Sequence, residues 1–522
     1  MNTGIKTLCI AVAAALSMTT IAGQTETPEG WYTAGKQAVE AASRLNKNPR
    51  KASNVILFVG DGMGISTVTA ARILEGQRRG ENGEENLLSF EMLPYVALSK
   101  TYNTNQQTPD SAGTMTAMMT GVKTKAGVIS VDQTAARGDC ASSKGAELVT
   151  FLEQAEKAGM STGVVTTARI THATPAATYA HVPERNWEDD HDLSAEAKEN
   201  GCKDIARQLI EFPYGDGIEV ALGGGRRSFW PRNQEDPEDA GKTGERDDLR
   251  NLTDEWVSNL DNAAFVWNKA QFDAVDSKTT GHLLGLFERS HMEYNVDMPG
   301  DTGGEPSIAD MTEKAIDILD NNRKGYFLMV EAGRIDHGHH AGNAYRALDD
   351  AIAFSDAIKV AMEKTDPRDT LIIVTADHSH VFTIGGYPTR GNPILGKVVG
   401  NDNRGEPVGM SIAMDGKPYT TVSYANGLGF ASLETGGETR YNFPPAPGRV
   451  VNLTAVDTED EGFHQEALVP LSSETHAGED VAIYAGGAGA YLLHGVQEQN
   501  VIYHVMNKAS KIESRLKGHH YR

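Results

Sequence analysis

The chain has 522 residues, of which 39% are hydrophobic and 23% are charged, a balance typical of a globular protein rather than a disordered one. Asp and Glu number 71 against 48 Lys and Arg, which gives a formal net charge of −23. So acidic a surface argues against nucleic acids and anionic membranes as general partners, because they carry charge of the same sign.

The amino terminus has the pattern of a secretory signal peptide, which we assign to residues 1–23. Lys6 precedes an apolar run at residues 8–18 that is too short for a stable membrane span, and small residues follow it near Gly23. A buried first helix is the alternative. We therefore expect residues 24–522 to form a mature chain that is exported, either periplasmic or secreted.

The rest of the chain alternates between short apolar runs and segments with helical periodicity. The runs are apolar on both faces, as in strands of a parallel sheet covered by helices. We predict an α/β fold: a three-layer sandwich with a large, mostly parallel central sheet flanked by helices. Strands are predicted at residues 55–59, 163–167, 218–222, 326–330, 371–375 and 480–484, and helices at residues 30–45, 144–158, 307–319 and 344–364.

Residues 385–471 differ from the rest of the chain in composition. Gly, Pro and Asn become more frequent there, helical periodicity is lost, and short β-like pieces such as residues 419–424 lie among turns. We predict that this segment is a small β-rich subdomain inserted into the sandwich.

The cysteines predict one disulfide bond. Cys9 lies in the predicted signal peptide, which leaves Cys140 and Cys202 as an even pair in an oxidising compartment. A free buried pair is the alternative. Two cysteines so far apart make a poor zinc site, so any metal must be bound by histidines and carboxylates.

Potential ligands repeatedly follow the predicted strands. The carboxyl ends of parallel strands meet at one edge of a sheet, where ligands bind. One such acid is commonly a cap or a turn residue, but four strands that end this way indicate a shared site. The residues in question are Asp61, His172 with Thr174, Glu331, and Asp377 with His378.

Histidines are concentrated in residues 336–340, where Asp336 and His340 would share one face of a helical turn. Single histidines are usually structural, but imidazole and carboxylate gathered this densely favour zinc. Other residues offer a third imidazole or the hard oxygens that magnesium prefers. Together the candidate ligands fit two zinc ions and one magnesium ion. The third imidazole is His476, and the oxygen ligands for magnesium are Asp61, Thr174 and Glu331.

Two residues are candidates for direct action on a phosphoryl group. Ser111 stands where a helix is predicted to begin, a position that favours an anion, and a serine beside a metal can act as a nucleophile. Its alternative role is a helix cap. Arg185 could hold phosphoryl oxygens with its bidentate fork, or form a surface ion pair with Glu184 or Asp189.

With these residues in place, the chain resembles the alkaline phosphatase family, and is closer to the animal type than to the shorter bacterial type. The resemblance implies hydrolysis of phosphate monoesters to an alcohol and inorganic phosphate, through a phosphoserine and with an alkaline optimum. Residues 24–522 would then be the catalytic domain. The resemblance covers residues 54–507 and rests on the order and spacing of residues 59–64, 109–111, 171–174, 333–340, 375–380 and 474–480.

The resemblance implies a role for each candidate residue. Ser111 is the nucleophile, and Arg185 holds the phosphate. His172, His337 and His380 lie behind the metal ligands and tune them. The implied ligands are Asp336, His340 and His476 for one zinc, Asp61, Ser111, Asp377 and His378 for the other, and Asp61, Thr174 and Glu331 for magnesium.

The resemblance also implies features outside this centre. The insert matches the crown at the dimer interface of animal enzymes, and Tyr387 matches a residue that reaches the partner's active site, so a homodimer is expected. The Cys140–Cys202 pair has a counterpart in those enzymes. No lipid anchor is expected, because residues 517–522 are polar. A possible calcium site would comprise Glu238, Phe287, Glu288 and Glu305.

Two rival functions remain open. A phosphodiesterase or another hydrolase could share the metal core, although a sulfatase would need Pro and Arg after its modified residue, where Ala112, Gly113 and Thr114 follow Ser111. A non-catalytic exported metal-binding protein would need neither Ser111 nor Arg185, so mutation of either residue discriminates between the two classes.

Overall fold

The structure is a computed structural model that describes residues 27–428 and 452–519. The chain divides into two compact units, Met1–Asn46 and Lys47–Arg522. In the first unit, helix α1 (Pro28–Ser43) begins after Thr27, whose hydroxyl oxygen accepts a hydrogen bond from the backbone N–H of Gly30. The helix predicted at residues 30–45 is therefore confirmed within about two residues at each end. The predicted signal peptide lies outside the described residues.

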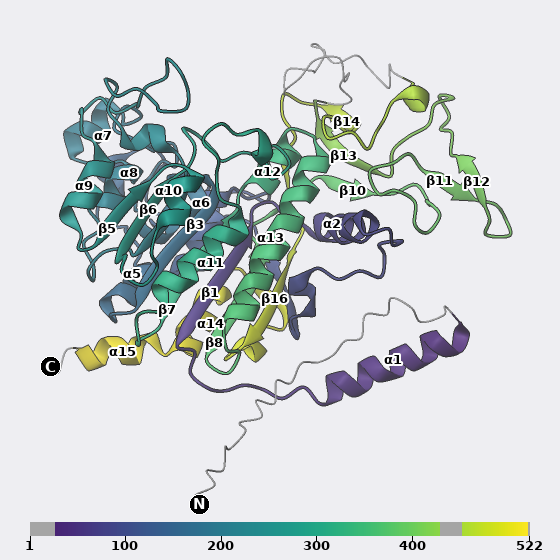
Figure 1. Ribbon diagram of the computed structural model, residues 1–522, viewed down its shortest axis with the longest axis horizontal. Coiled ribbons are helices and arrows are strands. Elements are labelled where there is room, and N and C mark those ends of the chain that lie inside the picture. Colours follow the sequence, from purple (N-terminus) through teal and green to yellow (C-terminus); the bar gives the residue numbers. More distant parts are fainter. Residues whose placement is uncertain (1–26, 429–451, 520–522) are drawn as a thin grey trace, which may run out of the picture. The chain divides into compact units, whose positions relative to one another are not determined.

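The second unit is built on a ten-stranded sheet in the order β17-β2-β16-β8-β1-β7-β3-β4-β6-β5 (Figure 1). Strand β16 pairs antiparallel with both of its neighbours, and every other pair of adjacent strands in this sheet is parallel, so the predicted mostly parallel sheet is confirmed. The strands are β1 (Asn54–Gly60), β2 (Tyr95–Lys100), β3 (Ser161–Arg169), β4 (Val220–Gly224), β5 (Ala263–Val266), β6 (His282–Leu286), β7 (Tyr326–Ala332), β8 (Thr370–Ala376), β16 (Val481–Gly487) and β17 (Gly495–Glu498).

Helices cover both faces of this sheet, as the alternation of side chains along β1 shows. Val55, Leu57 and Val59 belong to one hydrophobic core, while Ile56 and Phe58 belong to the other. The fold is thus the predicted three-layer sandwich. Its helices are α2 (Ile65–Arg78), α3 (Ser111–Thr120), α4 (Cys140–Ser143), α5 (Phe151–Lys157), α6 (Ala173–Tyr179), α7 (Ala195–Asn200), α8 (Ile205–Ile210), α9 (Leu252–Asn259), α10 (Lys269–Ala274), α11 (Ile308–Leu319), α12 (Arg334–His340), α13 (Ala344–Lys364), α14 (Val501–Ser510) and α15 (Ile512–His519).

One predicted helix was wrong in its first half. The helix at residues 144–158 is replaced by an irregular segment followed by α5, which begins only after Thr150. Thr150 and Glu153 form a capping box, in which each side chain accepts a hydrogen bond from the other's backbone N–H. The helix therefore starts at the cap residue Thr150, six residues after the predicted start at residue 144.

The predicted insert contains small sheets separate from the central one (Figure 1). Residues 429–451, which fall inside the insert, lie outside the described residues. The strand predicted at residues 419–424 is displaced to β13, where Tyr424 pairs with Phe382. The insert and its neighbours contain β9 (Ser379–His380), β10 (Phe382–Ile384), β11 (Val399–Asn401), β12 (Pro407–Met410), β13 (Val422–Gly427), β14 (Ala467–Pro470) and β15 (His476–Ala477).

Cys140 and Cys202 form the predicted disulfide bond, with their Cα atoms 6.0 Å apart. The bond connects the start of α4 to the loop that follows α7. The alternative of a free buried pair is therefore wrong. In the described part of the chain, no helix is both long enough and apolar enough to cross a membrane.

Candidate metal centre and active site

Four adjacent strands, β8, β1, β7 and β3, bring the predicted ligands together. Asp61 follows β1, Asp377 follows β8, Glu331 lies near the end of β7, and Thr174 is the second residue of the short helix α6 after β3. All four residues are buried, with at most 1% of their surface exposed. These residues, which follow four adjacent strands, therefore lie together at one edge of the sheet.

Ser111 is the first residue of α3 and is 2% exposed. The cap of this helix is Asp110, whose Oδ1 accepts a hydrogen bond from the backbone N–H of Gly113 at 3.1 Å. The alternative that Ser111 serves only as the cap is therefore wrong. Its Oγ lies 3.1 Å from Nε2 of His378, so the hydroxyl faces the ligand cluster.

The first group of ligand atoms surrounds Nε2 of His378. Oδ1 of Asp61 and Oδ2 of Asp377 each lie 3.3 Å from this nitrogen, and Oγ of Ser111 lies 3.1 Å from it. Ligands about 2.0–2.1 Å from a tetrahedral zinc ion are separated by about 3.3–3.4 Å. Burial and His476 hold the pKa of His378 well below its usual value, which favours the neutral, metal-binding form. The group therefore fits one zinc ion.

A second group consists of Asp336, His340 and His476. Nε2 of His340 and Nε2 of His476 each lie 3.4 Å from Oδ1 of Asp336 and 3.1 Å from each other. The Nδ1 atoms face backbone carbonyl oxygens, His340 that of Glu474 at 2.7 Å and His476 that of Pro109 at 2.8 Å. If Nδ1–H donates there, each Nε2 presents a lone pair to the carboxylate, an arrangement that a cation stabilises.

His380 lies behind this second group rather than within its ligand set. Its Nε2 lies 2.7 Å from Oδ1 of Asp336, and its Nδ1 lies 2.6 Å from Oε2 of Glu474. Although burial lowers it, Glu474 and Asp336 raise the pKa of His380 to about 10, and both ring nitrogens have carboxylate partners. His380 thus connects Glu474 to Asp336 behind the second group.

The third group combines Asp61, Glu331 and Thr174 with His172. Both carboxylate oxygens of Asp61, Oε1 of Glu331, Oγ1 of Thr174 and Nδ1 of His172 are buried and have no hydrogen-bond partner. Burial, with Asp377, Asp336 and Glu331, raises the pKa of Asp61 well above its usual value. Oxygen atoms gathered without donors match a hard cation such as magnesium.

Arg185 points toward this centre rather than along the surface. Its Nη1 donates to Oδ2 of Asp110 at 3.1 Å, and its Nη2 lies 3.3 Å from Nε2 of His172. Glu184, the partner in the surface alternative, forms an ion pair with Arg137 instead. The alternative of an ion pair with Glu184 is therefore wrong. The guanidinium is instead bound to Asp110, the residue directly before Ser111.

His172 and His337 lie side by side, with ring centres 5.7 Å apart. The structure adds a third imidazole that the sequence reasoning missed, since His291 lies 4.1 Å from His337 and 5.4 Å from His172, centre to centre. His291 occupies an irregular segment between β6 and α11, where no periodicity or motif singled it out.

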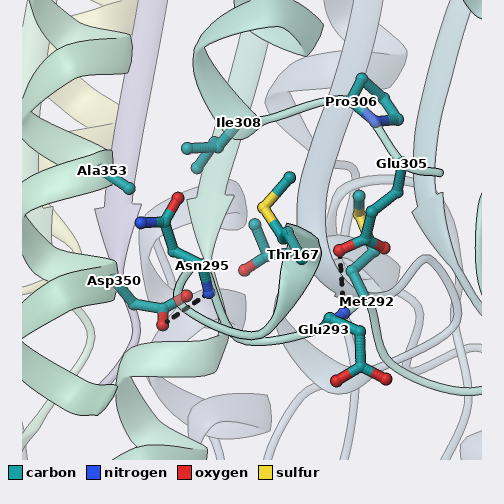
Figure 2. A pocket seen from close by; sticks show the side chains of 10 residues that line it. Thr167, Met292, Glu293, Asn295, Glu305, Pro306, Ile308, Asp350 and Ala353 are labelled. Atoms are coloured by element: carbon teal, nitrogen blue, oxygen red, sulfur yellow. Dashed lines mark hydrogen bonds between the residues drawn. The ribbon is translucent and has the colours of Figure 1, made fainter. Parts of the chain in front are cut away.

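A separate acidic cluster contains Glu238, Glu288 and Asp301, each with an oxygen within 4.8 Å of the others. The backbone oxygen of Phe287, one of the expected calcium ligands, accepts a hydrogen bond from Arg226. Asp301, which the sequence reasoning missed, stands in this cluster where Glu305 was expected. Glu305 is buried nearby, where its Oε1 accepts a hydrogen bond from the backbone N–H of Glu293, as Figure 2 shows.

Tyr387 is 96% exposed and has a positive φ of 55°, a conformation that is uncommon outside glycine. Its side chain therefore reaches away from this chain's own core. Exposed apolar residues also lie on the insert, among them Met410, Ile412, Met414 and Leu468.

Comparison with known proteins identifies the family. Residues 52–512 match the family described as alkaline phosphatase. The tissue-nonspecific alkaline phosphatase of Gallus gallus is 45% identical over 493 residues, which cover 93% of this chain and 90% of that protein. An alkaline phosphatase of Gadus morhua is 44% identical over 494 residues, covering 93% and 97%.

Solved structures agree on the fold. The alkaline phosphatase of Thermus thermophilus has a TM-score of 0.61 at 24% identity and covers 92% of this chain and 98% of its own. The chain therefore belongs to the metal-dependent alkaline phosphatase family, is closer to the animal type than to the short bacterial type, and hydrolyses phosphate monoesters through a phosphoserine with an alkaline optimum.

Proposed function

We propose that Ser111 is the nucleophile of this reaction and that it acts within a centre of two zinc ions and one magnesium ion. The observation that carries this proposal is the position of its Oγ, 3.1 Å from Nε2 of His378 and beside Asp61 and Asp377. Divalent ions bound there supply positive charge that favours deprotonated oxygen nucleophiles and leaving groups.

The donor chemistry assigns the ions. The His378 group and the His340–His476 group combine imidazole with carboxylate and fit zinc. The group of Asp61, Glu331 and Thr174 offers oxygen atoms and fits magnesium, with His172 behind it. Ser111 is a ligand as well as the nucleophile in this assignment.

The chain's own residues would divide the reaction into two displacements. In the first, Oγ of Ser111 gives up its proton and forms a bond to phosphorus, while the bond from phosphorus to the alcohol oxygen breaks and that oxygen takes up a proton to leave as the alcohol. In the second, a water oxygen attacks the phosphoserine, and the bond to Oγ breaks to release phosphate. Arg185, held by Asp110, would donate to two non-bridging oxygens throughout. His172 and His337 would keep the third group and the arginine in orientation.

We propose a calcium ion at Glu238, Glu288 and Asp301, with the carbonyl oxygen of Phe287 as a further ligand. Burial, with Glu238 and Asp301, raises the pKa of Glu288 to about 8, which expresses the cost of placing three carboxylates together without a cation. Calcium prefers six to eight oxygen ligands, so the set fits its chemistry. Glu305 would support the site from behind.

We also propose that the enzyme is an exported homodimer. The exposed Tyr387 and the apolar residues of the insert at residues 385–471 support a contact between two crowns. The signal-peptide pattern at residues 1–23 and the Cys140–Cys202 bond support export to a periplasm or outside the cell. Residues 24–522 would then form the catalytic domain, and the mature enzyme would become a phosphoprotein transiently, at Ser111.

The test is to measure metal content and hydrolysis of a chromogenic phosphate monoester together. Chelation should abolish hydrolysis, and zinc with magnesium should restore it. Asp336→Asn should lower the zinc content by about one ion per chain, and Glu331→Gln should lower magnesium instead. An unchanged metal content in both variants would overturn the assignment, and faster hydrolysis of a phosphodiester than of a monoester would favour the diesterase reading.

A further inference from the structure

His291 lies at the candidate active site although it is not among the residues that the family resemblance assigns. Its ring centre is 4.1 Å from that of His337 and 5.4 Å from that of His172. The three imidazoles come from different places, namely the segment after β6, helix α12, and the turn before α6. Because the three rings contact one another, each limits where the other two can lie.

The backbone around His291 is held against the carboxyl ends of two strands. The N–H of Met292 donates to the carbonyl oxygen of Thr167 in β3 at 3.1 Å. At Gly224, the last residue of β4, a Cβ would lie 2.1 Å from the carbonyl oxygen of Ser290, so the segment packs where only glycine fits. His291 therefore has a fixed place at the edge of the sheet that holds the ligands.

The residues after His291 are also anchored. The N–H of Glu293 donates to Oε1 of Glu305 at 3.0 Å, and the N–H of Asn295 donates to Oδ2 of Asp350 at 3.2 Å. Figure 2 shows these two hydrogen bonds on either side of a small cavity. Its volume of about 10 Å³ leaves room for about one water molecule. The segment is thus attached to helix α13 as well as to the sheet.

The imidazole of His291 is itself held by Arg169. The backbone N–H of Arg169 donates to Nδ1 at 3.2 Å, and this backbone contact holds the ring, since a neutral imidazole has only one acceptor nitrogen. Nε of Arg169 in turn donates to Oε2 of Glu188 at 2.7 Å. Burial lowers the pKa of His291 well below its usual value, with His337 and Arg169 acting in the same direction.

We propose that His291 is a positioning residue for phosphate-monoester hydrolysis: its ring holds His337 and His172 in place, and through His172 it orients the guanidinium of Arg185. His172 is the link, because its Nε2 lies 3.3 Å from Nη2 of Arg185. Arg334 holds the other neighbour, with its Nη1 donating to Nδ1 of His337 at 3.2 Å. This inference rests on the proposed roles of Arg185, His172 and His337.

The test compares three variants of the metal-loaded enzyme. His291→Ala removes the ring, His291→Phe keeps a ring against His337 and His172, and His291→Asn keeps an acceptor for the N–H of Arg169 without a ring. We expect the alanine and asparagine variants to lose about 10- to 100-fold in kcat/KM, as is usual for residues behind a metal site. Their inhibition constant for inorganic phosphate should rise in parallel, and the phenylalanine variant should regain most of both.

His282→Ala is the matched control, since His282 is also a buried imidazole, whose Nδ1 lies 3.0 Å from the carbonyl oxygen of Ile218 at the opposite end of the strands. It should lower the melting temperature without changing phosphate inhibition. Phosphate inhibition within twofold of wild type in His291→Ala and His291→Asn, whatever their melting temperature, would overturn the proposal. Ser111→Ala, assayed in parallel, separates this outcome from failure of the proposed function, because full turnover in that variant would remove the nucleophile assignment instead.

Discussion

Oγ of Ser111 and Nε2 of His378 lie 3.1 Å apart although 267 residues separate them in the sequence. The proximity arises because Ser111 begins a helix capped by Asp110, while His378 follows a central strand of the sheet. Ser111 belongs to helix α3 and His378 follows strand β8, so no single helix or strand accounts for their contact. The proposed nucleophile and the proposed zinc ligand are therefore brought together by the sandwich as a whole.

Ser111→Ala should lower turnover by at least about 1,000-fold, because an alanine side chain has no oxygen that could attack phosphorus. Three other ligands of its metal group would remain, so the zinc content should fall by less than one ion per chain. Steady-state hydrolysis and metal analysis of the same preparation check both expectations. A variant with half of the wild-type turnover would refute the assignment.

Arg185→Ala should raise the inhibition constant for inorganic phosphate by about 10- to 100-fold, through the loss of two charge-assisted hydrogen bonds. Arg185→Lys should recover only part of this, because an ammonium group lacks the bidentate fork. Arg137→Ala is the control, since Arg137 pairs with Glu184 and is exposed. Equal inhibition in wild type and Arg185→Ala would show that the guanidinium does not contact phosphate.

Glu474→Gln should weaken zinc binding at Asp336, His340 and His476. The carboxylate of Glu474 faces His380, which donates to Asp336, so its neutralisation loosens the orientation of that ligand. We expect about a 10-fold loss of zinc affinity, measured by titration with a chelator. Glu479→Gln, an exposed change just beyond strand β15, should have no effect, and equal zinc affinity in both variants would contradict this account.

Removal of the disulfide bond, by Cys140→Ser with Cys202→Ser, should lower the free energy of unfolding. The bond closes a segment with a sequence separation of 62 residues. The chain-entropy relation gives a loss of about 4 kcal/mol for a loop of this length. Chemical denaturation with metals bound measures it, and an unchanged midpoint would show that the unfolded chain is not constrained by the bond.

Asp350→Asn should stabilise the protein more at alkaline pH than at acid pH. Burial raises the pKa of Asp350 from 3.8 to about 8, so between these values the folded chain holds a proton that the unfolded chain has released. The unfolding free energy of the wild type therefore falls as pH rises through this window, by at most about 1.4 kcal/mol per pH unit, and is level above it.

Asparagine has no such proton and its side-chain oxygen can still accept from the N–H of Asn295. The difference in melting temperature between variant and wild type should thus grow from pH 5 to pH 8, where both are measured by calorimetry. Asp320→Asn, an exposed change, should show no such trend. A constant difference across this range would mean that Asp350 is ionised throughout.

The central strands and the ligands at their ends could be predicted from the sequence, because buried parallel strands are short apolar runs and the ligands follow them directly. His291 and Asp301 could not, since they lie between β6 and α11, where the backbone is shaped by tertiary contacts such as Met292 with Thr167. Strand β2 was missed for another reason. It alternates buried and partly exposed residues near the edge of the sheet, so it lacks the continuous apolar run of β1.

The position of the covalent phosphoryl group tests the central claim most directly. Enzyme mixed with excess phosphate monoester is quenched in acid during turnover, digested, and its phosphopeptide sequenced by mass spectrometry. The account predicts one phosphorylated residue, Ser111, in the wild type and none in Ser111→Ala. Phosphate on any other side chain, or its absence from Ser111 in an enzyme that turns over normally, would contradict it.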